Sequence, residues 1–576
     1  MTTGGKLIAE TLGAFGVRDA FGVHGGHLDA FLTGLVEVGI NVWDVRHEAA
    51  GGNAAEGYAR ATGGLGVAFA TSGPGFANAY SALANAMIDR IPLLLVTSSP
   101  PTRETELNVL QGGLDQVAAA RTVAKFVLQP TTAARLPDLT ALAIRHALTG
   151  VPGPVVLDVP IDVMFREVDP ALATTPVLRL PAAPAPAPAA MDHVVELLRQ
   201  AERPLLVLGG GASLSLGSAD ALAGLLDRVT LPVGVSSWGY GVLPPDHPCF
   251  AGGPADLAAI PFLAGVPDLV VLVGARRGIQ LGGRESGFMP AGTTIVQVDL
   301  DGAEPGRVGE LEAALVADVT EFLRALTARA TDLPGWAPWT ASVVGSRNAH
   351  AMLYGDPAAA DAVPEPEERL HPYFVAKLVA ESLQPTDTLV YDGGETAGWI
   401  NFFGRASRPR GWFGLGNMGG LGVGPGFAIG AQIGRPDGRT VLVTGDGAIG
   451  FHLQELETMA RLDLPITIVV FNNLGWGMSF HGQDIVYGEG SRVASDLPDT
   501  RYDTIAAALG LYGERVTRLD EIGPALERAR ASGGPACLDI TVDPAIVHPI
   551  MDALAADLPE GALRIPYYEP VPAGEA

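Results

Sequence analysis

Short apolar runs that end in glycine, aspartate or asparagine recur along the whole chain and constrain its fold more than any other feature. Amphipathic segments of helical length separate them. The runs are GVAFAT (66–71), PLLLVTS (92–98), GPVVLDVP (153–160), RPLLVLGGG (203–211), LVVLVGA (269–275), TIVQVDL (294–300), TLVYDGG (388–394), RTVLVTGDG (439–447) and ITIVVFNN (466–473). Buried strands joined by helices are typical of parallel sheets with both faces covered. The sequence therefore predicts an α/β fold of doubly wound parallel-sheet domains.

Two stretches that contain proline divide the 576-residue chain into thirds. VDPALATTPVLRLPAAPAPAPAA (168–190) is rich in proline and alanine and should be extended. DPAAADAVPEPEERLHP (356–372) is acidic and poor in signals for regular structure. The length also fits about three domains. We expect three domains and a C-terminal tail, at residues 1–167, 190–335, 365–546 and 547–576.

The composition excludes several classes of partner. The formal net charge is −26, with 63 acidic against 37 basic residues, so the protein should repel nucleic acid and anionic membranes. Cys249 and Cys537 form no CxxC motif, which disfavours a disulfide framework or a cysteine metal site. The N-terminus lacks the apolar core of a signal peptide, and no apolar run is long enough for a membrane span. We expect a cytoplasmic protein.

A strand, helix and strand pattern at residues 441–473 predicts a cation and phosphate site. The first strand ends in Gly445-Asp446-Gly447 and the second in Asn472-Asn473. Both loops should emerge at the same sheet edge, where ligands bind in such folds. Oxygen ligands with one formal charge suit Mg²⁺, and glycine amides suit a phosphate. An Asp or Asn in a loop is otherwise a cap or turn residue.

A single carboxylate precedes a run of alanine and glycine in RHEAAGGNAAEGYAR (46–60). Glu48 is expected to be half-buried, because small residues allow backbones and ligands to approach closely. From these residues alone it is either an acid at a helix N-terminus, favoured by the helix dipole, or a functional group.

Together these two motifs resemble a known family. GDG, 24 residues and then NN is similar to the thiamine diphosphate signature of the pyruvate oxidase and acetolactate synthase superfamily, and the segment around Glu48 matches as well. The resemblance implies three domains that bind the pyrimidine, an optional nucleotide and the diphosphate. It also implies that Asp446, Asn473 and the carbonyl of Gly475 hold Mg²⁺, which in turn holds the diphosphate.

The resemblance also implies roles around the thiamine ring. Glu48 would donate a proton to the pyrimidine N1′, which allows the 4′-imino group to remove the C2 proton, and desolvation would favour the protonated donor. Leu421 in GLGNMGGLGVGPGFAIGAQIG (414–434) would fold the cofactor as a wedge. Glu48 and Asp446 would come from different chains, so we expect a homodimer or homotetramer. The implied cofactor contacts are Gly394, Thr396, Gly419, Leu421, Gly445, Asp446, Gly447, Ala448, Asn473 and Gly475.

Several N-terminal segments resemble benzaldehyde lyase, among them FGVHGGHLDAF (21–31) and ETELNVLQGGLDQVA (104–118). His27 and Gln111 fall on polar active-site positions and are expected to handle the substrate's protons. The rest of the pocket departs from that pattern, because a tyrosine is replaced by Ala397, a histidine by Leu415, a tryptophan by Ile161 and an alanine by Met478. The expected substrate pocket consists of His24, Gly26, Ala397, Leu415 and Met478.

We therefore predict a thiamine diphosphate- and Mg²⁺-dependent C–C lyase or carboligase acting on small aldehydes, hydroxyketones or 2-hydroxyacyl-CoA. The tail resembles the closing segment of acetolactate synthases and 2-hydroxyacyl-CoA lyases. Acetolactate synthase, 2-oxoacid decarboxylase and an inactive cofactor-binding subunit remain alternatives. The middle third could hold ADP or FAD. CoA phosphates could meet one of two arginine groups, Arg276, Arg277 and Arg284 or Arg405, Arg408 and Arg410.

Overall fold

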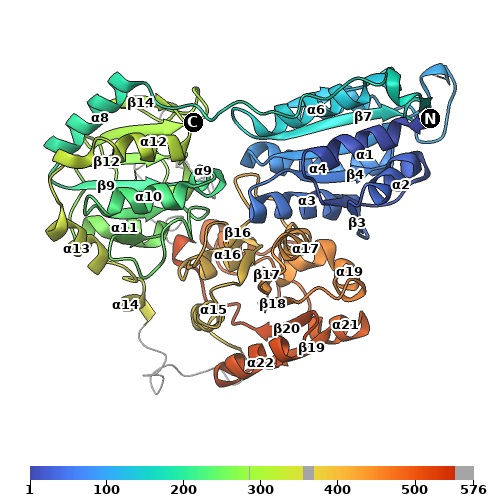
Figure 1. Ribbon diagram of the computed structural model, residues 1–576. Coiled ribbons are helices and arrows are strands. Elements are labelled where there is room, and N and C mark those ends of the chain that lie inside the picture. The colour runs from blue at the N-terminus through green and yellow to red at the C-terminus, as the bar shows by residue number, and fades with distance from the viewer. Residues whose placement is uncertain (105, 285, 355–368, 552–576) are drawn as a thin grey trace. The chain divides into compact units, whose positions relative to one another are not determined.

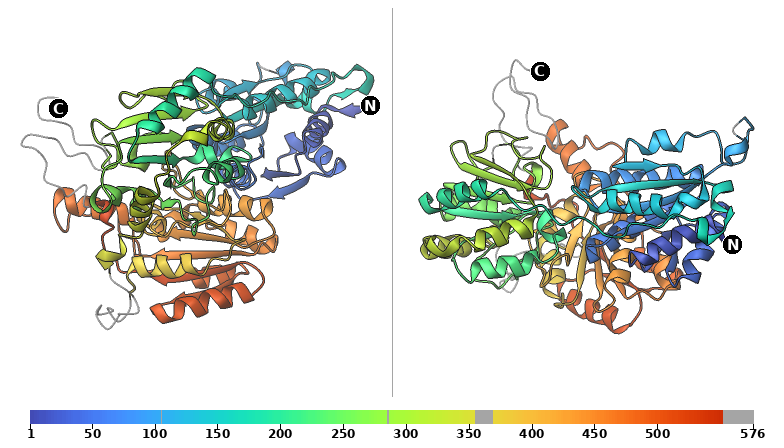
Figure 2. Two further views of the ribbon diagram at one scale, coloured as in Figure 1. Left: turned by 60° about the vertical axis from the view of Figure 1, so that its left-hand side comes forward. Right: turned by 45° about the horizontal axis from the view of Figure 1, so that its top comes forward.

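The computed structural model describes residues 1–104, 106–284, 286–354 and 369–551. Within these ranges the chain forms three six-stranded sheets and a two-stranded antiparallel sheet of β1 (Thr2–Thr3) and β8 (Glu167–Val168). The six-stranded sheets are parallel and are flanked by helices, as Figure 1 and Figure 2 show. The predicted α/β class with three parallel sheets is thus confirmed. No helix of the described ranges is long and apolar enough to cross a membrane.

The first sheet has the strand order β3-β2-β4-β5-β7-β6. Its strands are β2 (Asp19–Gly22), β3 (Asn41–Asp44), β4 (Gly66–Ala70), β5 (Leu93–Ser99), β6 (Phe126–Leu128) and β7 (Pro154–Pro160). The connecting helices are α1 (Gly4–Ala14), α2 (Asp29–Glu37), α3 (Glu48–Thr62), α4 (Pro74–Asp89), α5 (Gln116–Ala120) and α6 (Leu136–Leu148), and α7 (Ile161–Met164) follows the last strand. Strands β4, β5 and β7 are buried along their whole length, which explains their uninterrupted apolar sequences.

The second sheet has the order β11-β10-β9-β12-β13-β14. Its strands are β9 (Pro204–Leu208), β10 (Val233–Val235), β11 (Phe250–Gly252), β12 (Leu269–Val273), β13 (Thr294–Asp299) and β14 (Ala313–Val316). The larger helices around it are α8 (Pro188–Gln200), α10 (Ser218–Leu226), α11 (Pro254–Leu263), α12 (Val319–Thr327) and α13 (Ala337–Gly345). The strand order reverses between β9 and β12, which is where doubly wound sheets bind ligands.

The third sheet has the order β16-β15-β17-β18-β20-β19. Its strands are β15 (Thr388–Tyr391), β16 (Trp412–Gly414), β17 (Thr440–Gly445), β18 (Ile466–Asn472), β19 (Tyr512–Val516) and β20 (Ala536–Thr541). Its helices are α15 (Pro372–Glu381), α16 (Gly394–Asn401), α17 (Gly424–Gly434), α18 (Asp446–Ile449), α19 (Glu455–Arg461), α20 (Gly477–Tyr487), α21 (Tyr502–Ala508) and α22 (Leu519–Ala531). Because β17 and β18 are neighbours, the loops that follow them emerge at one edge.

Packing divides the chain into two compact units that do not follow the expected thirds. Of the described residues, one unit comprises those within 1–182, 414–440 and 451–466, and the other comprises those within 183–413, 441–450 and 467–551. Segments of the last third, among them α17 and α19, therefore pack with the first sheet. The domain limits derived from the linkers stay a prediction.

The alanine and glycine run of α3 packs closely against α17 within the first unit. A Cβ atom on Gly430 would overlap the Ala54 carbonyl oxygen, and one on Gly57 would overlap the backbone of α17. Ala54 itself is fully buried. Ala50, Ala54 and Gly57 therefore serve this helix contact, whereas Gly51 and Gly52 face β2 and α4.

Gly430→Ala should push α3 and α17 apart and lower the urea midpoint of unfolding. Overpacking of a dense contact costs about 1–3 kcal/mol. Gly523→Ala is the matched control, because Gly523 lies inside α22 and a Cβ there would meet nothing within 4 Å. The control should be neutral or stabilising by up to about 1 kcal/mol. Equal midpoints for the two variants would contradict the tight contact.

Candidate active site

Three polar side chains form a hydrogen-bonded chain at the carboxyl edge of the first sheet. His27 follows β2, and its Nδ1 lies 2.8 Å from the Ser72 hydroxyl oxygen. Ser72 follows β4, is fully buried and donates to Gln111 Oε1 at 3.0 Å. Thr71 also donates to Gln111 Oε1, at 3.3 Å, and Gln111 adopts a left-handed backbone with φ of 60°. The structure thus joins the predicted residues His27 and Gln111 through Ser72, which the sequence analysis did not identify.

With the Gln111 amide oxygen facing Ser72 and Thr71, the hydrogen bonds favour one tautomer of His27. An amide oxygen only accepts, so the single hydroxyl proton of Ser72 goes to Gln111. The Ser72 oxygen then accepts from Nδ1–H of His27, and Nε2 keeps its lone pair. Partial burial lowers the pKa of His27 below its usual range. His27 is therefore a neutral imidazole at pH 7, and within the described ranges no residue hydrogen-bonds its Nε2.

The other predicted residues of this loop are arranged differently. His24 is exposed, and its Nε2 lies within hydrogen-bond distance of Asp29 Oδ1, at 2.8 Å. Gly26 is exposed at the start of a 3₁₀ turn, and a Cβ there would meet nothing within 4 Å. In the described structure, neither residue takes part in the hydrogen bonds that join His27, Ser72 and Gln111. Their place in a substrate pocket therefore stays a prediction.

Glu48 is the first residue of α3 and is half-buried, as expected. His47 caps the helix, because its Nδ1 accepts from the Ala49 amide at 3.1 Å. Glu48 Oε2 accepts from the side chain of Asn78 at 2.9 Å. A Cβ on Gly75 would lie 3.5 Å from Glu48 Oε1, so glycine keeps that oxygen accessible. The capping role thus belongs to His47, which leaves the carboxylate of Glu48 available for other chemistry.

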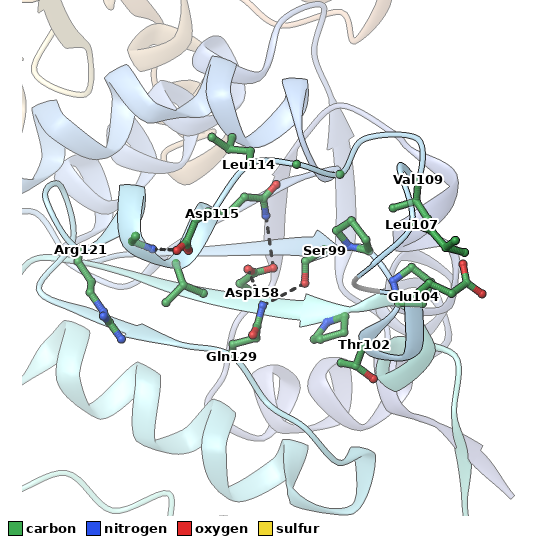
Figure 3. Close-up of a pocket in the computed structure, with 18 residues that line it drawn as sticks. Ser99, Thr102, Glu104, Leu107, Val109, Leu114, Asp115, Arg121, Gln129 and Asp158 are labelled. Atoms are coloured by element: carbon green, nitrogen blue, oxygen red, sulfur yellow. Dashed lines mark hydrogen bonds between the residues drawn. The ribbon is translucent and has the colours of Figure 1, made fainter.

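A pocket of about 520 Å³ continues the same sheet edge over β5, β7 and β6 (Figure 3). Asp158 lies on its floor and is almost fully buried, which raises its pKa to about 6. The Gln116 side chain donates to the Ser98 carbonyl at 2.9 Å, lies 3.4 Å from Asp158 and accepts from the Gly73 amide at 2.6 Å. Gln116 therefore connects the pocket to the turn that carries Ser72.

Three oxygen atoms converge at the carboxyl edge of the third sheet. Asp446 is buried beside β17, and Asn473 and Gly475 follow β18. The Asn473 amide group places its oxygen position 3.1 Å from Asp446 Oδ1 and 2.8 Å from the Gly475 carbonyl oxygen. Burial raises the pKa of Asp446 to about 7, although the Gly447 and Gly475 amides donate to its carboxylate at 2.9 and 3.0 Å.

This donor set fits a magnesium ion. Oxygens at such distances repel one another unless the amide turns its nitrogen inward or a cation lies among them. Adjacent ligands of an octahedral Mg²⁺ with bonds of about 2.1 Å are separated by about 3 Å, which matches the observed spacing. The structure therefore brings Asp446, Asn473 and Gly475 together in a geometry suited to Mg²⁺. The Gly447 amide, expected to be free for a phosphate, is instead bonded to Asp446.

Helix α16 lies against this loop and against α20. A Cβ on Gly445 would lie 3.2 Å from Thr396 Oγ1, and one on Gly394 would lie 3.0 Å from Met478. Gly447 must be small as well, because a Cβ there would lie 2.7 Å from the Trp476 ring. Ala397 and Ala448 are buried. These predicted cofactor and pocket positions thus surround the three oxygens.

The loop that carries Leu415, Gly419 and Leu421 is held by a buried charge network of the first unit. Asp89 accepts from the Asn417 amide at 3.1 Å and from Arg60 at 2.7 Å. Arg60 also donates to Glu56 at 2.5 Å. Leu415 and Leu421 are half-buried, and Gly419 is exposed with φ of 66°. The sequence analysis did not assign a role to this network, although it is part of the EGYAR motif.

The glycines at the switch point of the second sheet are engaged in contacts with the backbone. The Gly209 and Gly211 amides donate to the Val273 and Gly274 carbonyls, both at 3.0 Å. Arg277 donates to the Arg284 carbonyl at 3.0 Å, and burial lowers the pKa of Arg277. A bound ADP, FAD or CoA phosphate therefore stays a prediction. The expected closing tail lies mostly at 552–576, outside the described residues.

Comparison with known proteins agrees with this arrangement. Residues 2–119, 191–326 and 392–540 match the N-terminal TPP binding domain, the central domain and the C-terminal TPP binding domain of the thiamine pyrophosphate enzymes. The chain is 34% identical over 557 residues to a probable acetolactate synthase of Mycobacterium bovis, covering 96% of this chain and 98% of that protein.

Two further relatives carry different names. Acetolactate synthase isozyme 2 large subunit of Escherichia coli is 30% identical over 551 residues, covering 94% of this chain and 95% of that one. Human 2-hydroxyacyl-CoA lyase 2 is 30% identical over 559 residues, covering 90% and 86%. The chain therefore belongs to the thiamine diphosphate-dependent enzymes of the pyruvate oxidase and acetolactate synthase superfamily, and it is an enzyme that forms or cleaves carbon–carbon bonds.

Proposed function

We propose that the enzyme is a Mg²⁺-dependent C–C lyase and carboligase that acts on 2-hydroxy carbonyl compounds, either hydroxyketones or 2-hydroxyacyl thioesters of coenzyme A. The observation that carries this proposal is the chain of hydrogen bonds from His27 through Ser72 to Gln111. Cleavage of a bond beside a hydroxyl group requires a base for the hydroxyl proton. The free Nε2 of neutral His27 is such a base, and the Ser72 bond orients its ring.

The magnesium and diphosphate site would be formed by the third sheet. Asp446, Asn473 and the Gly475 carbonyl would hold Mg²⁺, while Thr396 and the small residues around it leave room for the diphosphate. Bound thiamine diphosphate would supply the electron sink for the bond that breaks or forms.

Glu48 would hold the proton at the pyrimidine N1′. In this chain its carboxylate is half-buried and accepts one hydrogen bond from Asn78. A protonated carboxyl group is favoured in a dry environment, which a second copy of the chain would complete. We therefore propose a homodimer, or a pair of dimers, in which each site is shared between chains.

Ala397, Leu415 and Met478 would make the substrate pocket apolar. Such pockets discriminate weakly by size, about 10–200-fold per methylene, so the enzyme should accept several acyl groups. Acetolactate synthesis is the second candidate, because relatives at 30–34% identity over most of the chain carry that name. Comparing cleavage of a hydroxyketone with decarboxylation of pyruvate separates the two, and we expect cleavage to be faster.

His27→Ala should reduce C–C cleavage by about 10²–10⁴-fold, the range for loss of a general base. Pyruvate decarboxylation should fall much less, since that reaction has no hydroxyl proton to remove. Ser72→Ala should reduce cleavage less strongly, because the base is kept but loses its orientation. His193→Ala serves as the control for a surface histidine, because His193 lies on α8 and contacts Glu312 at the surface. Equal losses of both reactions in His27→Ala would favour the acetolactate synthase assignment.

Asp446→Ala should abolish binding of thiamine diphosphate with Mg²⁺, measured by equilibrium dialysis. Prolonged chelation of the wild type should remove activity, and Mg²⁺ with thiamine diphosphate should restore it. Asp520→Ala is the control, because Asp520 is exposed and forms a surface ion pair with Arg518. Cofactor retention by Asp446→Ala would exclude this carboxylate as a metal ligand.

Glu48→Gln should still bind the cofactor but should slow exchange of its C2 proton, measured by NMR with quenched samples. The amide preserves the shape but cannot donate an acidic proton, and we expect a loss of about 10²–10⁴-fold. Glu37→Gln, which changes a surface ion pair with Lys6, should leave the exchange rate unchanged. An unchanged rate in Glu48→Gln would restrict Glu48 to a structural role.

A further inference from the structure

A buried histidine and glutamate connect the two helices beside the proposed cofactor site. His481 of α20 and Glu395 of α16 are only 3% and 5% exposed. His481 Nδ1 lies 2.6 Å from Glu395 Oε1, and its Nε2 lies 2.9 Å from the Pro544 carbonyl oxygen. One imidazole ring thus ties α16, α20 and the segment after β20 together.

The partners of this ring determine how many protons the pair holds. The Pro544 carbonyl only accepts, so Nε2 must donate to it. The 2.6 Å contact between Nδ1 and a carboxylate oxygen also needs a proton. That proton makes either an imidazolium beside a carboxylate or a neutral imidazole beside a carboxylic acid. In both cases the pair holds one proton more than a neutral histidine with an ionised glutamate.

The same pair adjoins the proposed metal loop. A Cβ on Gly477 would lie 2.8 Å from Glu395 Oε2 and 2.6 Å from the Asn473 side-chain nitrogen position. Gly394 of α16 and Met478 of α20 are also close, because a Cβ on Gly394 would lie 3.0 Å from the Met478 side chain. Movement of α16 away from α20 would therefore displace Thr396 and Ala397 relative to the metal loop.

We propose that Glu395 and His481 are positioning residues that share one buried proton and hold α16 against α20 in the geometry needed for cofactor binding. The positioning role rests on the proposed function, whereas the proton count does not. Loss of the proton would leave a buried carboxylate facing the lone pair of a neutral imidazole, and the link would open.

The other titratable side chains on the elements that pack around His481 form ion pairs or hydrogen bonds with other partners. On α20, Asp484 pairs with Arg492 at 2.7 Å, and Arg492 also lies 3.6 Å from Asp496. From the segment after β20, Asp543 accepts from the Ala545 amide and His548 from the Ile550 amide. From the metal loop, Asp446 is bonded to two amides. Glu395 is therefore the carboxylate that the described structure places on His481.

Glu395→Gln is the decisive variant, because it keeps both hydrogen bonds without the extra proton. The glutamine amide can donate to Nδ1, while Nε2–H of a neutral ring still donates to Pro544. Unfolded histidine titrates near pH 6.5 and unfolded glutamate near 4.3. The unfolded wild type holds one proton on these two groups below about pH 6 and none above about pH 7, whereas the folded pair keeps one. The free energy of unfolding of the wild type should therefore fall as pH rises above 6.5. The variant should instead gain stability up to 6.5 and then level off.

The measurement is urea unfolding of both apo-proteins from pH 5.5 to 8. The ratio of their unfolding constants, wild type over variant, should rise by up to tenfold per pH unit, because the pair accounts for one proton. A ratio constant within about twofold would overturn the shared proton. A second measurement needs no variant of Glu395: the wild type should show a far-downfield proton resonance at pH 8 that is absent from His481→Phe, and its absence from the wild type would also overturn the proposal.

The positioning role is tested by the affinity for thiamine diphosphate with Mg²⁺ at pH 6.5, where the pair holds its proton. Glu395→Ala, which breaks the link between the two helices, should bind the cofactor about 10–100-fold more weakly than the wild type, whereas Glu395→Gln, which keeps both hydrogen bonds, should bind it as the wild type does. Equal affinities of Glu395→Ala and the wild type would overturn the positioning role. Neither measurement uses substrate turnover, so a failure of the lyase assignment would leave both results interpretable.

Discussion

The buried contact between Arg60, Glu56 and Asp89 is the constraint on which the first unit depends most. Arg60 and Asp89 are 4% exposed and Glu56 is fully buried. Burial raises the pKa of Glu56, and the Arg60 guanidinium acts in the opposite direction. Removing one partner of a buried ion pair costs about 3–5 kcal/mol, since the other charge is left uncompensated. The network therefore tolerates little movement, and it fixes α3, α4 and the loop at 416–417 to one another.

This rigidity matters because α3 connects several functional features. Its first residue is Glu48, its middle packs against α17, and its last turn holds Arg60. Asp89 also accepts a hydrogen bond from the Asn417 amide, which holds the loop that carries Leu421 against the same network. The proposed roles of Glu48 as a general acid and Leu421 as a steric wedge would require positions accurate to within a fraction of an ångström, and sites built on helices achieve this better than sites on loops alone.

Patterns of local sequence predicted the strands and the loops that carry chemistry, whereas contacts between distant segments were not predictable. Apolar runs ending in Gly, Asp or Asn marked the strands, and adjacent strands brought Asp446 and Asn473 to one edge. Ser72 follows one of those runs, yet its role depends on a loop 39 residues away. Gly57 of α3 faces Phe427 of α17, 370 residues further along the chain, so its place in the sequence could not reveal the partner. Burial patterns mark a residue as packed but do not say against what.

Two histidines show how hydrogen-bond partners decide between chemistry and structure. His27 donates to a serine hydroxyl, is half-buried and keeps one ring nitrogen free, so it can accept a proton from a substrate. His481 contacts a carboxylate with one ring nitrogen and a carbonyl oxygen with the other. A ring with both nitrogens engaged by buried partners links the elements that carry them, whereas a ring oriented by one hydroxyl can present its other nitrogen to a substrate. The same side chain is thus suited to the proposed role of a base on the first sheet and to the proposed link between two helices beside the third.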